Sequence, residues 1–158
     1  MDKKEFKRQF GQIAISHGFD YLYSAWNKKS DKCMIILDLQ KSNYSELYYL
    51  NIKVYIKGLF NEPYELSKSL IKHGVGDIFI RQPDEYSVAF DLESELSDVE
   101  RIVLLEALFV DFLIPFSREC MTIIGIKSLL EKESIFLLPA VKNELYRVYP
   151  NYFEAGSL

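Results

Sequence analysis

The sequence predicts an α+β fold, in which an antiparallel β-meander of about five strands is packed on one side by helices. One helical pattern precedes a run of strand-like segments, and further helical patterns follow it. The strand-like segments alternate with a period of two and end in short turns, which is typical of antiparallel strands with one solvated face. A long buried helix near residues 97–114 is expected to supply the core beneath the sheet.

The stretch 97–116 is expected to form this long helix. Ser97 and Glu100 have the spacing of a capping box, so each side chain can bond a backbone N–H of the first turn. Apolar residues then lie on nearly every side, which indicates burial against several partners. Two carboxylates within the run argue against a membrane span. Pro115 is expected to end the helix because it has no N–H to donate to the preceding turn.

The other elements follow in chain order. Asp2 can cap a first helix over residues 2–17, and Gly18 suits its C-terminal end. Pro139 suits the first position of a last helix. The expected strands are residues 19–28, 32–41, 46–57, 77–81 and 86–92, and the further expected helices are residues 64–72, 121–132 and 139–147.

Composition narrows the class of protein. A chain of 158 residues that is 49% hydrophobic suits one domain, expected over residues 1–150 with a C-terminal tail at 151–158. The net charge of −4 argues against nucleic acid as a partner, since such binding depends on neutralising phosphates. The two Cys have no metal or redox spacing, and the N-terminus lacks the apolar core of a signal peptide, so a cytoplasmic location is expected.

Residues that could carry chemistry lack the partners that chemistry needs. His17 and His73 belong to no ligand pair, and Cys33 lies on an apolar strand face where a thiol packs. Cys120 follows an arginine, which alone is a weak sign of a reactive thiol. The glycines near residue 75 precede an expected strand and match no phosphate loop. The sequence therefore predicts no catalytic residue, no metal site and no cofactor.

A recognition surface is expected on the second face of the meander. The alternation turns Cys33, Ile35, Leu37 and Leu39 toward the helices, which leaves polar and aromatic side chains on the opposite face. Such a mixture offers rigid area with fixed donors and acceptors. Packing is the alternative, because aromatics are common in sheets and amides can satisfy each other across strands. The predicted binding residues are Trp26, Asp38, Gln40, Tyr49, Asn51 and Tyr55.

Several short segments resemble a known bacterial family. They are Gly18-Phe19 after the first helix, Trp26 late in the next strand, Leu39-Gln40-Lys41-Ser42, Tyr48-Tyr49-Leu50-Asn51-Ile52, and Leu-Ile-Pro-Phe at residues 113–116. The family is described only as a domain of unknown function, DUF4304, and the resemblance covers about residues 6–146. It brings no catalytic residues with it. Related domains of this size are sometimes proposed as immunity or accessory proteins in bacterial conflict systems, which is a hint about role only.

Three functions follow as hypotheses. The first is a non-enzymatic domain that binds a protein partner through the sheet face or through the acidic segment 84–100. The second is a small-molecule-binding protein or hydrolase with a cleft between sheet and helices, where Asp38, Glu106 or His73 would do acid–base work. The third is a homodimer formed through the sheet. The absence of a catalytic motif favours the first.

Overall fold

The computed structural model describes residues 1–153, and these contain five strands in one antiparallel sheet of order β1-β2-β3-β4-β5. The strands are β1 (Asp20–Leu22), β2 (Ala25–Lys29), β3 (Cys33–Lys41), β4 (Tyr48–Ile56) and β5 (Ile78–Arg81). The helices include α1 (Lys3–Ser16), α2 (Lys68–His73), α3 (Ser87–Phe90), α4 (Asp98–Ala107), α5 (Ile114–Cys120), α6 (Ile123–Glu131) and α7 (Pro139–Val148).

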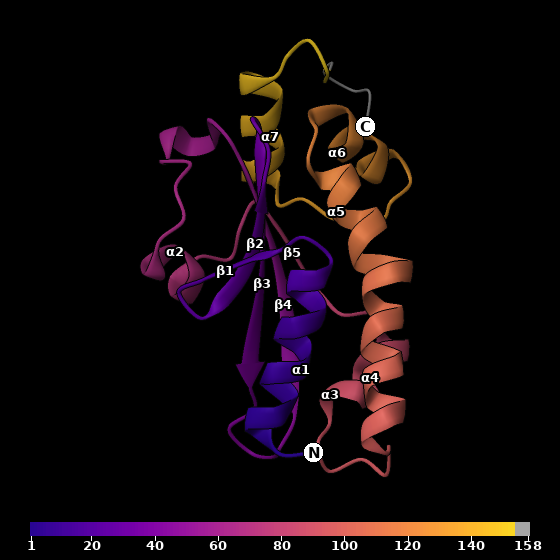
Figure 1. Ribbon diagram of the computed structural model, residues 1–158. Helices are drawn as coiled ribbons and strands as arrows, with labels where there is room; N and C mark the ends of the chain where they lie inside the picture. Colours follow the sequence, from indigo (N-terminus) through magenta and orange to yellow (C-terminus); the bar gives the residue numbers. More distant parts are fainter. Residues whose placement is uncertain (154–158) are drawn as a thin grey trace.

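Helices lie on both sides of the sheet. Figure 1 shows α2 on one side, and α1 with α4 on the other. The α+β class and the antiparallel meander are therefore confirmed. The expectation that helices pack on one side only is wrong, because α2 covers part of the second face.

The segment expected as one strand over residues 19–28 is a hairpin. Tyr23 and Ser24 form a two-residue turn between β1 and β2, with φ angles of 53° and 63°. A tight hairpin turn needs this left-handed backbone, and Asn-Gly is its usual sequence signal. Because Tyr and Ser rarely adopt such angles, the sequence carries no sign of the turn.

β3 and β4 form the centre of the sheet and separate two apolar clusters. Leu37 pairs with Ile52, and both side chains face the main core beside α1, α4 and α5. The next residue back along β3, Ile36, points to the opposite face, where it meets Ile71 of α2. This second cluster consists of Ala25, Met34, Ile36 and Ile71.

Residues 86–92 do not form the strand that the alternation predicts. A 3₁₀ turn at Asp84–Tyr86 leads into α3, which ends at Phe90, and Asp91 then forms an isolated bridge with Leu47. The buried guanidinium of Arg101 donates to the carbonyls of Ala89 at 2.7 Å and Asp91 at 2.8 Å. These bonds satisfy carbonyls that a short helix leaves open. A contact from α4 thus stabilises the helical form.

The long helix begins at the predicted capping box but does not end at Pro115. Ser97 Oγ accepts from the Glu100 N–H at 3.2 Å, and the Glu100 carboxylate accepts from the Ser97 N–H at 2.8 Å. A π-helical stretch, Leu108–Leu113, then joins α4 to α5. The wider π turn accommodates a proline that cannot donate and would clash in a regular helix, so Pro115 lies in the first turn of α5.

The long helix is buried on one side only. Leu105, Leu108 and other apolar residues face the core, whereas Val99 is 72% and Val103 is 61% exposed. The helix therefore packs on the core along one face, and the apolar side chains of its other face are exposed. Figure 1 places α4 at the outside of the molecule, next to α1.

The C-terminal helices follow the prediction closely. α6 and α7 occupy the expected segments, and Pro139 is the first residue of α7. Phe153 is buried and stacks on Tyr146 with ring centroids 5.5 Å apart. The expected tail at 151–158 lies outside the described residues from 154 onward. Within residues 1–153, no helix is long and apolar enough to cross a bilayer.

Candidate functional site

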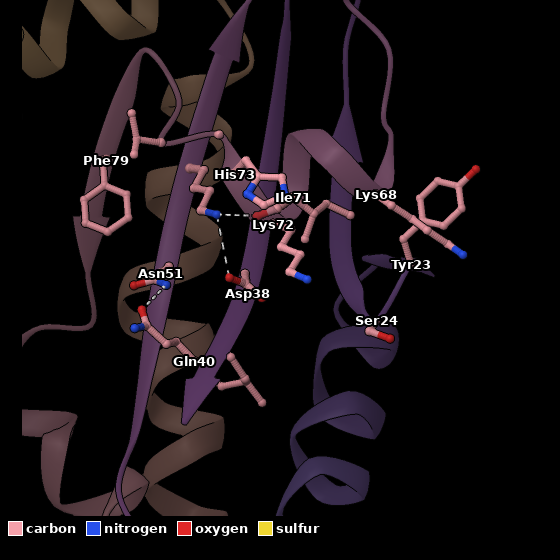
Figure 2. A pocket seen from close by; sticks show the side chains of 14 residues that line it. Tyr23, Ser24, Asp38, Gln40, Asn51, Lys68, Ile71, Lys72, His73 and Phe79 are labelled. Atoms are coloured by element: carbon pink, nitrogen blue, oxygen red, sulfur yellow. Dashed lines mark hydrogen bonds and ion pairs between the residues drawn. The ribbon is translucent and has the colours of Figure 1, made fainter. Parts of the chain in front are cut away.

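A groove lies between the second face of the sheet and α2, and we call it the α2 groove. It has a volume of about 730 Å³. Side chains of β3 and β4 form its floor, α2 and the following loop form its wall, and the β1–β2 turn and β5 form its rims (Figure 2). The lining residues are Tyr23, Ser24, Asp38, Leu39, Gln40, Asn51, Lys53, Lys68, Ile71, Lys72, His73, Gly74, Val75 and Phe79.

The floor of the groove is a hydrogen-bonded row of polar side chains across three strands. Asp38 lies opposite Asn51 in the register of β3 and β4. The Asn51 side-chain amide donates to Gln40 Oε1 at 2.9 Å, and its oxygen accepts from Arg81 Nε at 3.2 Å. Figure 2 shows the first of these bonds. The row fixes the orientation of both amides, since each is held by a neighbour.

Lys53 joins the floor to the wall. Its side chain is 5% exposed, and its ammonium donates to the Ile71 carbonyl at 2.6 Å and lies 3.6 Å from Asp38 Oδ2. The carbonyls of the last turn of a helix have no partner within the helix, and a lysine is a suitable one. Lys53 thereby fixes α2 against the sheet and balances the charge of Asp38.

A close approach at Gly74 also holds α2 in place. The Tyr55 hydroxyl donates to the Leu70 carbonyl at 3.2 Å. A Cβ on Gly74 would come within 2.0 Å of that hydroxyl oxygen. Only glycine therefore allows the end of α2 to lie directly on Tyr55.

Cations dominate the wall of the groove. Lys68 and Lys72 lie one turn apart on α2 and are exposed, as is His73. In the described part of the chain, neither lysine has an ion-pair partner, and the ammonium of Lys68 lies 5.9 Å from the centroid of the Tyr23 ring. Among the described lining residues Asp38 is the only carboxylate, and Lys53 already balances it. The groove is thus positively charged in a chain whose net charge is −4.

Two exposed aromatic side chains flank the groove. Tyr23 is 41% and Phe79 is 42% exposed, and they stand on opposite rims in Figure 2. Tyr23 and its neighbour Ser24 both have the left-handed backbone described above. That conformation costs a non-glycine residue roughly 1 kcal/mol or more, and such costs often occur at binding sites.

The predicted binding residues divide into three groups. Asp38, Gln40 and Asn51 line the groove. Tyr49 lies beside it on β4, where the Arg81 guanidinium lies 4.4 Å from its ring centroid. Tyr55 is on the same face, but α2 covers it, and burial raises its pKa to about 12.

Trp26 does not join this surface. Its register partner is Leu37, so its side chain points to the main core, where it lies under α1 and is 5% exposed. The expectation for this residue is wrong. The indole lies 4.9 Å from the Phe10 ring in an edge-on arrangement, which is a packing contact.

Sequence reasoning missed the cationic wall. The spacing of Lys68 and Lys72 by four residues places them on one face of a helix, and this signal was present in the sequence. What the sequence lacked was the side of the sheet on which α2 packs. That side is set by Lys53 and Tyr55, which reach carbonyls on α2 from β4.

The three candidate acid–base residues do not meet. Asp38 and His73 share the groove, but Asp38 faces Lys53, and the imidazole of His73 has no hydrogen-bond partner among residues 1–153. Glu106 lies on α4 and contacts His17 of α1, with 2.8 Å between Oε2 and Nε2. Asp38, His73 and Glu106 therefore do not converge on one cleft, which is what the hypothesis of acid–base work between sheet and helices requires.

Cysteine and metal chemistry find no support in the described residues. Both thiols are buried, and burial raises the pKa of Cys33 to about 12 and raises the pKa of Cys120 as well. A protonated buried thiol is an inert packing group. Within residues 1–153, no group of three or more His, Cys, Asp or Glu side chains is placed to hold a metal ion.

Comparison with known proteins places the chain in a family. No curated protein and no solved structure is significantly similar to it. A family model matches residues 10–119, which span the sheet, α2 and almost all of the long helix. Every residue that lines the α2 groove falls within this range. Since the match covers more than half of the chain, the protein belongs to the family described as Domain of unknown function (DUF4304).

Proposed function

We propose that this protein is a non-enzymatic binding domain that recognises an acidic segment of a partner protein in the α2 groove. The observation that carries the proposal is the charge of the groove. Lys68 and Lys72 stand free on its wall, while its one described carboxylate, Asp38, is held by Lys53. Fixed cations on a concave surface attract anions, speed their association and orient them.

The rims and floor supply what a protein partner needs beyond charge. Exposed aromatics such as Tyr23 and Phe79 are typical anchors of protein interfaces. The amides of Gln40 and Asn51 retain acceptor and donor capacity after their mutual bond. The carboxylates of an acidic segment can therefore contact the lysines of α2, and the backbone of the segment can bond the amides of the floor.

The same features argue against catalysis in the groove. His73 is exposed and Asp38 is tied to an ammonium, so the two do not form an acid–base pair. Binding an acidic partner is compatible with the immunity-like or accessory role that the family resemblance suggests. That role is part of the proposal.

A small anionic molecule is the second candidate ligand. The volume of about 730 Å³ is within the range of small-molecule sites. A compact tricarboxylate such as citrate could bridge Lys68 and Lys72. Titration with citrate separates the candidates, because only a small-molecule site would bind it in the micromolar range.

The test measures fluorescence anisotropy of a labelled octaglutamate peptide with the wild type and two double variants. Lys68→Gln with Lys72→Gln removes the free cations of the groove. Lys127→Gln with Lys132→Gln removes the same charge from α6 and its C-cap, away from the groove, and serves as the control. We expect the first variant to bind at least about tenfold more weakly and the control to bind about as the wild type does. Equal affinity in all three proteins would overturn the proposal.

A further inference from the structure

A second hollow lies on the other side of the β1–β2 turn, between α1 and the sheet. Its volume is about 430 Å³, and we call it the α1 hollow. It meets the rim of the α2 groove at Ser24 and Leu39, but its other lining residues are different. Most of its floor is apolar, with Trp26 and Tyr21 on the sheet side. An apolar hollow of this size with a few polar groups at one end is typical of a small-molecule site.

The α1 side of the hollow changes character along the helix. Lys4, Lys7, Gly11 and Ile15 follow one another at helical spacing and line one stripe. The stripe begins with cations and ends with Ile15, an apolar side chain that is 57% exposed. The rise of an α-helix separates its two ends by about 16 Å. The hollow therefore has a cationic end and an apolar end.

The two lysines at the cationic end are free to bind. Arg8 is already engaged, because its guanidinium donates to both oxygens of Glu5 at 2.8 and 2.6 Å. Lys4 has no ion pair in the described part of the chain. Lys7 contacts only a ring, with its ammonium 5.7 Å from the centroid of Tyr48. Their charges are therefore not balanced by a neighbouring carboxylate.

Trp26 lines the hollow on its sheet side. The residue is 5% exposed, and among residues 1–153 its indole N–H has no hydrogen-bond partner. Its Nε1 edge lies against Gly11, where an added Cβ would be 3.1 Å from Cζ2 and 3.5 Å from Nε1. Gly11 lets α1 pack directly on this edge, so Nε1 is covered and a ligand in the hollow does not reach it. Trp26 therefore lines the hollow with its apolar ring surface and not with its N–H.

We propose that the α1 hollow binds a small carboxylic acid with an unbranched apolar chain. The carboxylate lies between Lys4 and Lys7, and the chain extends over the indole toward Ile15. The separation of cations and apolar residues sets this direction. A membrane surface fits less well, because the most apolar side of α1, with Phe6 and Phe10, is already in the core.

The experiment follows the fluorescence of Trp26, the only Trp in the chain, during titration with decanoate below its micelle concentration. We expect a saturable change in emission with decanoate and none with 1-decanol, which has the same chain without the charge. Lys4→Gln with Lys7→Gln should weaken binding at least about tenfold, because it removes both free cations. Lys68→Gln with Lys72→Gln, which alters the neighbouring α2 groove, should leave the affinity within about twofold of the wild type.

Trp26→Phe tests the contact between the apolar chain and the indole ring, and it is followed by calorimetry, since the variant has no Trp. It keeps a ring in place, so a fold loss is not expected, and circular dichroism checks this. A clear loss of affinity supports the assignment.

The proposal is overturned if decanoate gives no saturable signal, if decanol binds equally well, if the Lys4 and Lys7 variant binds like the wild type, or if only anionic phospholipid vesicles bind. None of these results depends on octaglutamate binding, so the proposals for the two sites are tested independently.

Discussion

The two faces of the sheet are built from the same strands but are covered to different extents. The face toward α1, α4 and α5 is apolar along the whole length of β3 and β4, and helices close it. The other face is apolar only where Ile71 of α2 meets Met34 and Ile36. Beyond that point it carries Asp38 and Asn51 and opens into the α2 groove. A strand can thus support a closed core on one side while its other side changes within two residues from a buried apolar side chain, Ile36, to a polar one that lines a groove, Asp38.

The largest expected effect comes from the closed face. Leu37→Ala removes a fully buried side chain, and we expect it to lower the free energy of unfolding by about 3 kcal/mol. Gln40→Ala, on the open face three residues later, should cost less than about 1 kcal/mol, because the side chain is exposed. Urea denaturation measures both. Similar losses in the two variants would show that the faces do not differ as described.

The second-largest expected effect tests the hydrogen bond by which β4 holds α2 on the open face. Lys53→Met leaves the Ile71 carbonyl and Asp38 without their cation, and we expect a loss of about 2 kcal/mol. Amide hydrogen exchange in α2 should become faster, because this helix loses its hydrogen bond to the Lys53 ammonium on β4. Lys72→Met is the control, since its ammonium is exposed and unpaired in the described residues. Unchanged exchange in α2 would show that Lys53 does not hold the helix.

The smallest effect concerns pH. Asp77 follows the loop after α2, and its carboxylate accepts from the Ile56 N–H at 2.7 Å, yet burial raises its pKa from 3.8 to about 6. The folded state therefore binds this proton more tightly than the unfolded state does. This contribution to stability is complete below the unfolded pKa and is lost as pH rises from about 4 to about 6.

Asp77→Asn should remove that pH dependence. At pH 7 the variant should be more stable than the wild type by between about 1 and 2 kcal/mol, and near pH 3 the two should agree. Thermal or urea unfolding at a series of pH values measures the difference. A difference that does not vary with pH would rule out a raised pKa for Asp77.

Sequence reasoning succeeded where structure depends on near neighbours. The alternation in β3 and β4 correctly separated Asp38 and Asn51 from the core face. The Ser97–Glu100 capping box needs only two residues one turn apart, and it is present as predicted. Local signals of this kind can be read directly from the chain.

Sequence reasoning failed where contacts between residues far apart in the chain determine the local structure. The Tyr23–Ser24 turn has no usual turn residue, and once it divides the first expected strand, the register of β2 turns Trp26 toward the core. Residues 86–92 alternate like a strand, but Arg101 from α4 bonds the carbonyls of a helix there. The cationic wall of the groove was missed for the same reason, because α2 is positioned by β4 and not by its own sequence.

The attachment of α2 has a consequence for how this family could diversify. The helix is joined to β4 through the tips of two long side chains, Lys53 and Tyr55, which end on the adjacent carbonyls of Ile71 and Leu70. The reach of these two side chains, together with the packing of Ile71 on the sheet, sets the width of the groove. A substitution of either by a shorter or longer residue would change the opening of the groove while the main core on the other face of the sheet remains intact.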